Sequence, residues 1–149
     1  MLAAWMALIF LFSSQGAKDS SRLSEGFARN LAQLFVRDFG RMPGAEQMDL
    51  IGGLQLLVRK GAHMFLFFVL WLLAVGAART YKATFWRRLL AAFCLVLLYA
   101  VSDEVHQAFV PGRAAMASDV MIDMAGALAG SLAIVGARAL KQKDITESQ

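Results

Sequence analysis

A six-residue segment, residues 102–107, places two carboxylates, an imidazole and an amide at the end of a long apolar run. On a helix, Asp103, His106 and Gln107 would stand at positions i, i+3 and i+4 and would share one face. Glu104 would be turned about 100° away from that face. His106 could transfer a proton there, with Asp103 or Glu104 orienting the imidazole. Charged groups at such a place are costly to bury, which indicates a functional site.

Two further aspartates, Asp119 and Asp123, are spaced four residues apart and would also share a helix face. The same face continues through Gly126 and Gly130, a pattern of small residues that lets a neighbouring helix approach closely. The aspartate face is therefore predicted to be the packing face of its helix, with both carboxylates directed into a bundle.

Three cations accompany these carboxylates, and they could bind phosphate or another anion. Arg59 and Lys60 precede His63, which stands four residues after Arg59 and is a second candidate for proton transfer. Arg113 ends a Val-Pro-Gly-Arg segment, residues 110–113, whose proline and glycine suit the central positions of a type II turn. Such a turn would fold Arg113 back over the carboxylates.

The composition indicates a membrane protein. Of the 149 residues, 58% are hydrophobic and 17% are charged, and the mean hydropathy is +0.55. This length suits a single membrane domain, residues 1–149, without room for a separate globular part. The net charge of +4 comes from cations beside apolar runs, which favours contact with anionic lipid over nucleic acid. Cys94 is the only cysteine, which excludes a disulfide framework and a thiolate metal site.

The apolar segments predict an all-α fold, a polytopic membrane helical bundle with four transmembrane helices. These helices are expected at about residues 1–14, 57–78, 85–108 and 117–138. When each of the last three is extended to about 20 residues from its cationic end, its opposite end takes in the polar candidates. The candidates should therefore lie at one depth. The first helix would be only about 21 Å long, which a gene start placed too far downstream, or tilt in a thinned bilayer, would explain.

The cations also predict the orientation of the chain. Four cations lie between residues 79 and 88, and three follow the last apolar segment between residues 138 and 143. Because positively charged loops stay in the cytoplasm, both clusters and both termini should be cytoplasmic. The polar candidates would then lie at the outer edge of the cytoplasmic (inner) membrane.

The first outer link is predicted to contain an amphipathic helix at about residues 21–39. Its apolar positions recur at helical spacing: Leu23, Phe27, Leu31, Leu34 and Phe35. This helix could lie along the outer interface or pack on the transmembrane helices as a lid, because both arrangements share the periodicity. A separate shorter helix is expected from Ala45 toward Gly52-Gly53.

The chain resembles the VanZ-like membrane protein family. The signature half of that family is similar to SDEVHQAFVPGR at residues 102–113, followed by DV at 119–120 and DMAG at 123–126 with Gly130. RKGAH at residues 59–63 resembles its upstream Lys-x-x-His element, and IFLFSSQ at residues 9–15 is similar to the end of its first span. Asp123 departs from the family pattern, in which asparagine is expected there as often as aspartate.

The resemblance implies a bacterial cell-envelope protein without a defined reaction. The founding member of the family is associated with reduced susceptibility to a glycopeptide antibiotic, so a role related to glycopeptide resistance is implied. Most relatives lack an established biochemical activity. The residues themselves must therefore carry the functional hypotheses.

Three classes of function remain open. The first is a hydrolase or transferase acting on a lipid-linked or phosphate-bearing envelope component, with His63, Asp103, Glu104 and His106 as catalytic candidates. The second is binding of such a component, or a structural role, with these ligand-binding candidates: Arg59, Lys60, Gln107, Arg113, Asp119 and Asp123. The third is proton-coupled transport, although no polar residue at the cytoplasmic end outlines a pathway. The hydrolase elements Gly-x-Ser-x-Gly and His-Glu-x-x-His are absent from the sequence.

The charges bear on cofactors and partners. Three cations face four carboxylates, which is the near balance that a self-satisfied buried network requires. The histidines and carboxylates could bind a divalent metal, but we expect nearby arginine and lysine to satisfy the carboxylates, so no cofactor is predicted. The expected partners are membrane lipids and a lipid-linked envelope precursor or another small anionic ligand.

Overall fold

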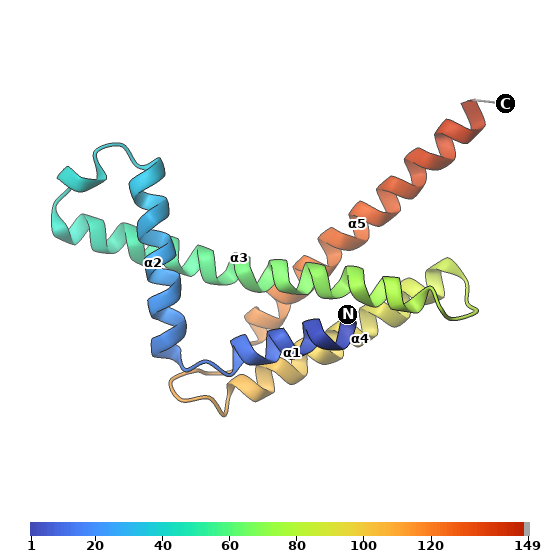
Figure 1. Cartoon of the computed structure of the whole chain (residues 1–149), viewed down its shortest axis with the longest axis horizontal. Helices are drawn as coiled ribbons and strands as arrows, with labels where there is room; N and C mark the ends of the chain where they lie inside the picture. The colour runs from blue at the N-terminus through green and yellow to red at the C-terminus, as the bar shows by residue number, and fades with distance from the viewer. Residues whose placement is uncertain (148–149) are drawn as a thin grey trace.

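A computed structural model describes residues 1–147, and every regular element in this part of the chain is a helix (Figure 1). The elements are α1 (Leu2–Ser13), α2 (Ala17–Phe35), the short 3-10 helix η1 (Phe39–Arg41), α3 (Gly44–Ala78), α4 (Phe85–Gln107) and α5 (Ala117–Glu147). The predicted all-α fold is thus confirmed.

Three of these helices are long and apolar enough to cross a bilayer: α3, α4 and the Ala117–Lys141 part of α5. The chain is therefore a multi-pass membrane protein. The sequence predicted four spans, but α1 has only 12 residues and measures about 18 Å. A full crossing by α1 stays a prediction.

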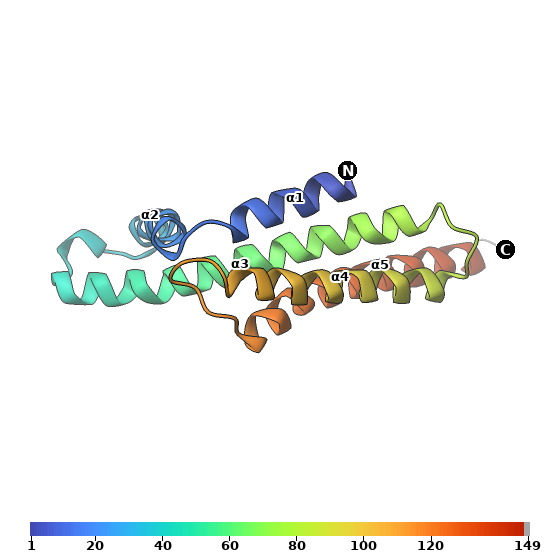
Figure 2. The ribbon, with the colours of Figure 1, turned by 90° about the horizontal axis from the view of Figure 1, so that it is seen from below.

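Helix α1 lies alongside α3 and α4 in both views (Figures 1 and 2). Two hydrogen bonds fix it there. The indole Nε1 of Trp5 donates to the carbonyl of Leu66 at 2.9 Å, and the hydroxyl of Tyr99 donates to the carbonyl of Met6 at 2.6 Å. Between the helices, α1 contributes the fully buried Ile9 to the core. The short helix is thus a docked part of the bundle.

The closest packing in the bundle joins α3 to α5. A Cβ added at Gly126 would collide with the main-chain carbonyl of Met64, and one added at Gly130 would lie 2.9 Å from Cε3 of Trp71. Only a residue without a side chain permits this approach, which is what the small-residue ridge in the sequence indicates. The ridge therefore brings the first turns of α5, with their aspartates, against α3.

Helices α3 and α5 both extend beyond their predicted boundaries. The expected separate helix near Ala45 is wrong, because α3 runs without a break from Gly44 through Gly52-Gly53. Each glycine inside a helix costs about 1 kcal/mol relative to alanine. This cost is too small to end α3 here, because the helix is held by its packing against α2. Helix α5 extends to Glu147 rather than residue 138, because no proline or glycine follows to stop it.

Helix α2 lies crosswise to the long helices (Figures 1 and 2). Small residues, Ser24, Ala28 and Ala32, are buried and form the face that packs on α3. The apolar stripe predicted from the sequence points elsewhere, since Leu23 and Phe27 are 64% and 58% exposed. Helix α2 thus packs on α3 through its small residues, and contact of its apolar stripe with the bilayer interface stays a prediction.

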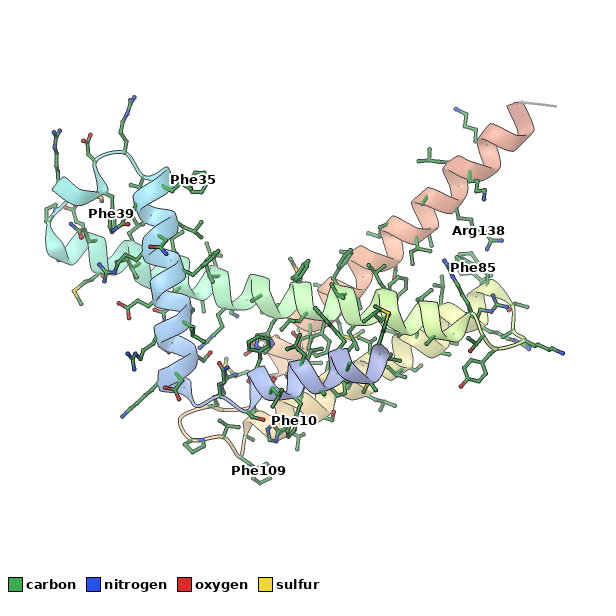
Figure 3. The ribbon with its side chains drawn as sticks, in the orientation of Figure 1. Phe10, Phe35, Phe39, Phe85, Phe109 and Arg138 are labelled. Atoms are coloured by element: carbon green, nitrogen blue, oxygen red, sulfur yellow. The ribbon has the colours of Figure 1, made fainter. Side chains whose placement is uncertain are left out.

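The chain leaves α2 through a sharp turn. The predicted range of residues 21–39 is shifted to Ala17–Phe35, because Val36 adopts an extended conformation that ends the helix, and Asp38 follows in a left-handed conformation with φ 61°. Figure 3 shows the consequence for two aromatic side chains near this turn. Phe35 is 76% exposed at the end of α2, whereas Phe39 is buried against α2 and α3.

The two ends of the bundle carry different structures. At one end, the link between α3 and α4 lies near α5, where the guanidinium of Arg138 stands 4.1 Å above the ring of Phe85 (Figure 3). At the other end, the α1–α2 link meets the loop between α4 and α5 (Figure 1), and the amide of Ala17 donates to the carbonyl of Pro111 at 3.3 Å. The polar candidates lie at this second end.

Candidate functional site: a polar cavity beside an apolar groove

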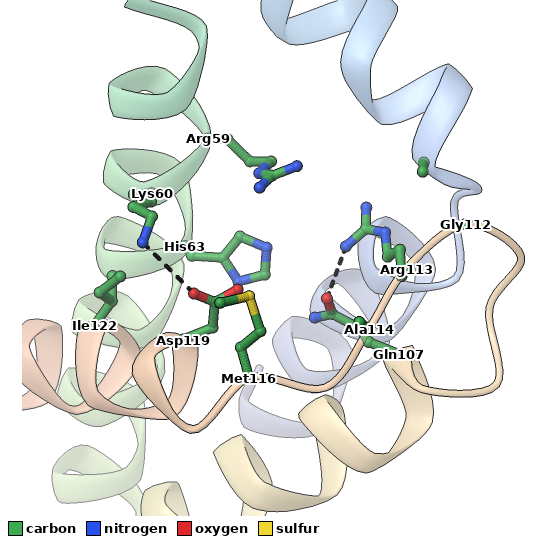
Figure 4. Close-up of a pocket in the computed structure, with 11 residues that line it drawn as sticks. Arg59, Lys60, His63, Gln107, Gly112, Arg113, Ala114, Met116, Asp119 and Ile122 are labelled. Atoms are coloured by element: carbon green, nitrogen blue, oxygen red, sulfur yellow. Dashed lines mark hydrogen bonds and ion pairs between the residues drawn. The ribbon is translucent and has the colours of Figure 1, made fainter. Parts of the chain in front are cut away.

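A polar cavity of about 140 Å³ opens where α4 ends and α5 begins (Figure 4). Its polar walls come from four different elements: Arg59, Lys60 and His63 of α3, Gln107 of α4, Arg113 of the following loop and Asp119 of α5. Six residues that the sequence singled out thus line one space.

The α4–α5 loop places Arg113 over this cavity. The amide of Arg113 donates to the carbonyl of Val110 at 3.1 Å, and Gly112 between them has φ 77°. These features are those of a type II turn, as predicted. Nη1 of Arg113 donates to Oε1 of Gln107 at 2.9 Å, which holds the guanidinium in place (Figure 4).

Arg59 and Arg113 form the positive side of the cavity. Burial, followed by repulsion from Arg59, lowers the pKa of Arg113 from its ordinary value. The ordinary pKa of arginine is so high that the side chain stays charged near neutral pH even when its pKa is lowered. Among the ion pairs of residues 1–147, none joins either arginine to a carboxylate. Two guanidinium groups without a carboxylate partner suit an anion between them.

Lys60 and Asp119 lie on the opposite wall and are paired with each other. Nζ of Lys60 lies 3.7 Å from Oδ1 of Asp119, and both side chains are about one-third exposed (Figure 4). Such a solvent-accessible pair contributes little to stability. It neutralises the carboxylate nearest to the cavity, so the two arginines dominate the charge that a ligand would meet.

Two carboxylates of α4 are buried behind these walls and have separate tasks. Oδ2 of Asp103 accepts from Oγ of Ser13 at 2.8 Å and from Nε2 of Gln107 at 3.0 Å. A chain of hydrogen bonds thus runs from Arg113 through Gln107 to Asp103 and ends on α1. Glu104 instead accepts from the main-chain amide of Met116 at 2.7 Å, which fixes the end of the loop.

Asp123 and His63 meet between α5 and α3. Asp123 is 1% exposed, and its Oδ1 lies 3.5 Å from Nδ1 of His63. The sequence predicted that arginine and lysine would satisfy the carboxylates of this cluster. That prediction is wrong for Asp103 and Glu104, and it does not hold for Asp123 either, because only Asp119 among the cluster's carboxylates pairs with a lysine or arginine in the described part of the chain.

His106 lies outside the polar cavity, although it shares a helix face with Asp103. Its ring centroid is 4.4 Å from that of Phe10, and its Nε2 lies 3.1 Å from Oγ of Ser14. Both partners belong to the end of α1 and the residue after it. The structure therefore separates the two histidines: His63 faces the cavity, and His106 faces α1.

Ser13 and Ser14 are the polar contacts that sequence reasoning missed. Each binds a polar candidate of α4, the first Asp103 and the second His106. The available signal was a pair of hydroxyl residues at the end of an otherwise apolar helix. Their partners depend on how α1 packs, which the local sequence does not specify.

A second, apolar cavity of about 320 Å³ adjoins the first. Most of its lining is hydrocarbon from α1, α2 and α3: Phe12, Leu23, Phe27, Val58, Ala62, Phe65 and Leu66. Arg59, His63 and Arg113 line both cavities. An apolar groove beneath α2 therefore adjoins the polar cavity, and these three side chains border both spaces.

The model of the VanZ/LLP1 family matches residues 1–138. This chain belongs to the VanZ/LLP1 family. No curated protein and no solved structure matches it at a significant level.

Proposed function

We propose that this VanZ/LLP1 protein binds an anionic, lipid-linked component of the cell envelope at the outer edge of the membrane. One observation carries the proposal: the polar cavity and the apolar groove share Arg59, His63 and Arg113. A ligand that fills both spaces must have a charged head joined to a hydrocarbon chain.

The head group is expected to be a phosphate. Arginine presents a planar set of donors that matches phosphate oxygens, and charge-assisted hydrogen bonds of this kind are the strong ones. Arg59 and Arg113 lie without a carboxylate partner in the described part of the chain. Burial and then repulsion from Arg59 lower the pKa of Arg113, and an anion between the two arginines would offset both.

The groove is expected to hold the adjoining part of the chain. Leu23 and Phe27 of α2 and Phe65 of α3 give it an apolar wall. These side chains are largely exposed in the protein alone, so a hydrocarbon ligand would cover them. A chain that comes from the bilayer gains no transfer free energy from water, so close packing against these side chains is what would favour a long chain over a free phosphate.

The binding hypothesis is favoured over a purely structural network and over transport. A structural network should satisfy its own charges, but Asp103 and Asp123 each keep a buried oxygen without a hydrogen-bond partner. A transporter needs polar groups along its length, whereas the core behind the cavity consists of residues such as Phe67, Leu70 and Val96. The outer placement follows the positive-inside expectation.

Native mass spectrometry of the protein in zwitterionic nanodiscs tests the proposal. A polyprenyl monophosphate should bind, whereas the matching uncharged polyprenol should bind at least tenfold more weakly. Arg113→Ala should lower the affinity for the phosphate lipid about tenfold or more, because one charge-assisted bond contributes about 1.5–3 kcal/mol. Arg37→Ala is the matched control, since this exposed arginine lines neither cavity.

Inorganic phosphate provides the second arm of the experiment. Phe27→Gln should weaken the phosphate lipid and leave the much weaker binding of free phosphate unchanged, because only the lipid uses the groove. Equal affinity for polyprenol and polyprenyl phosphate would refute a charged head group. Unchanged binding in the Arg59→Ala, Arg113→Ala double variant would refute this site.

A further inference from the structure

Three buried atoms without hydrogen-bond partners converge beside the polar cavity. They are Nδ1 of His63, Oδ1 of Asp103 and Oδ1 of Asp123. The three residues come from α3, α4 and α5, and one candidate ligand atom of each lies within 4.8 Å of the other two. Both aspartates are more than nine-tenths buried, with exposures of 3% and 1%. The helix packing therefore brings together three residues that each keep a buried atom without a hydrogen-bond partner.

Such an arrangement is unfavourable unless something binds it. A buried polar atom without a partner costs about 1–3 kcal/mol, and more when it is charged. Two of the nearby cations contact other groups, Lys60 with Asp119 and Arg113 with Gln107, and Arg59 forms no ion pair with either aspartate in the described part of the chain. The 3.5 Å between His63 and Asp123 is long for a hydrogen bond. A divalent cation would balance the charge of the two carboxylates.

We propose that His63, Asp103 and Asp123 bind one divalent transition-metal ion, zinc or manganese. One imidazole nitrogen with two carboxylate oxygens is a donor set that suits these ions. Ligand atoms bound at about 2.0–2.2 Å from one ion lie about 3–4 Å apart. The observed 3.5 Å between Nδ1 of His63 and Oδ1 of Asp123 is within that range.

The surroundings of Asp103 support this assignment. Both of its hydrogen bonds, from Ser13 and from Gln107, reach Oδ2 and leave Oδ1 free. Metal-binding carboxylates are commonly oriented by hydrogen bonds of this kind from a second layer of residues. Gln107 also binds Arg113, so the same side chain links the metal site to the proposed anion site.

Metal analysis of the purified protein tests the site without any lipid, so the result is independent of the ligand proposed above. The protein is stripped with a chelator and reloaded with Zn²⁺ alone or Mn²⁺ alone, using an affinity tag that contains no histidine. We expect about one ion per chain and a raised Tm, because an ion that binds only the folded state stabilises it. Asp103→Asn, Asp123→Asn and His63→Gln should each lower the affinity at least tenfold.

Two control variants should retain the ion. Asp38→Asn changes an exposed carboxylate at a left-handed position that asparagine tolerates. His106→Ala removes the only other histidine of the chain. X-ray absorption should therefore show one imidazole nitrogen around the ion in both the wild type and His106→Ala.

Three results would overturn the proposal. The first is that the wild type binds neither ion and its Tm does not change. The second is that all three ligand variants retain the metal. The third is that the X-ray absorption spectrum shows no imidazole ligand. The spectrum needs only the wild type and His106→Ala, so it decides the question even where a ligand variant fails to fold. A buried water or a shared proton in place of the metal would give the first of these results.

Discussion

The two ends of the bundle both carry arginines, but they use them differently. At the end formed by the α3–α4 link, cations such as Arg79 and Lys82 are exposed, and Arg138 stacks on Phe85. At the end formed by the α4–α5 loop, Arg113 is half-buried and turned over a cavity. Charge on a surface orients a helix in the bilayer, whereas charge over a cavity indicates a ligand.

Burial of carboxylates sharpens this contrast. The described part of the α3–α4 link contains no acidic residue, so its cations face water and lipid head groups. The opposite end buries Asp103, Glu104 and Asp123. Glu104 holds the loop, and Oδ2 of Asp103 accepts from Ser13 and Gln107, but Oδ1 of Asp103 and Oδ1 of Asp123 have no hydrogen-bond partner. When aspartates stay buried in a membrane protein without a lysine or arginine partner, their burial indicates that something else binds them.

The largest expected effect is on topology, because labelling of a single cysteine is nearly all-or-none. In a Cys94→Ala background, Lys82→Cys should react with an impermeant thiol reagent only from the cytoplasmic side. Phe109→Cys, at a position that is 82% exposed on the loop, should react only from outside. Labelling of both positions from the same side would show that the two ends do not face opposite compartments.

Next in size is the effect of Gly126→Ala, which places a methyl group against the carbonyl of Met64. The change should lower the stability of the folded state by about 2–4 kcal/mol, because main-chain atoms of α3 must move. Gly136→Ala in the same helix is the control, since nothing lies within 4 Å of its added Cβ. Thermal unfolding in detergent measures both, and equal Tm values would contradict the close approach of α3 and α5.

Glu104→Ala should have a smaller effect, about 1–3 kcal/mol, because it leaves the amide of Met116 without its acceptor. Glu104→Gln keeps an oxygen at that place and should lose less. The other end of α4 offers a comparison: Thr84 accepts from the amide of Arg87 at 3.5 Å and is exposed. Thr84→Ala should therefore lower Tm less than Glu104→Ala, and the reverse order would show that the loop is not held by Glu104.

The smallest effect is expected for His106→Ala. Loss of the Phe10 contact and of the Ser14 hydrogen bond should cost about 1 kcal/mol. Binding of the phosphate lipid and of metal should persist, because His106 lines neither cavity. The sequence proposed His106 as a catalytic candidate, and loss of binding or activity in a well-folded His106→Ala protein would support that role.

The depth of the polar residues could be predicted from the sequence. Counting about one bilayer thickness from the cations placed His63, Asp103, Asp119 and Asp123 at the same level, and the structure brings them to the same end. The type II turn at Gly112 could also be predicted, because proline and glycine occupy its central positions. Helix rise and turn geometry are local properties, so a short segment determines them.

The direction of each side chain around its helix could not be predicted. Asp103, His106 and Gln107 share one helix face, but that face is wide enough to touch two neighbours. Gln107 binds Arg113 of the loop, and His106 binds the end of α1. The packing of α1 decides between these outcomes, and it depends on distant contacts such as Trp5 with Leu66.

The apolar stripe of α2 shows the same limit. Its periodicity predicted a helix but left open which neighbour would cover it. In the structure, the small face of Ser24, Ala28 and Ala32 packs on α3, and the large residues remain outside. Small side chains give a weak sequence signal but allow a close crossing of two helices.

The position of the groove beneath α2 affects how a ligand would reach the protein. A lipid whose chain lies between Phe27 and Phe65 would enter sideways from its own leaflet, without passing through water. Occupancy would then depend on the mole fraction of that lipid in the leaflet, a two-dimensional concentration. Diluting the membrane with inert lipid should empty the groove, whereas diluting the surrounding buffer should not.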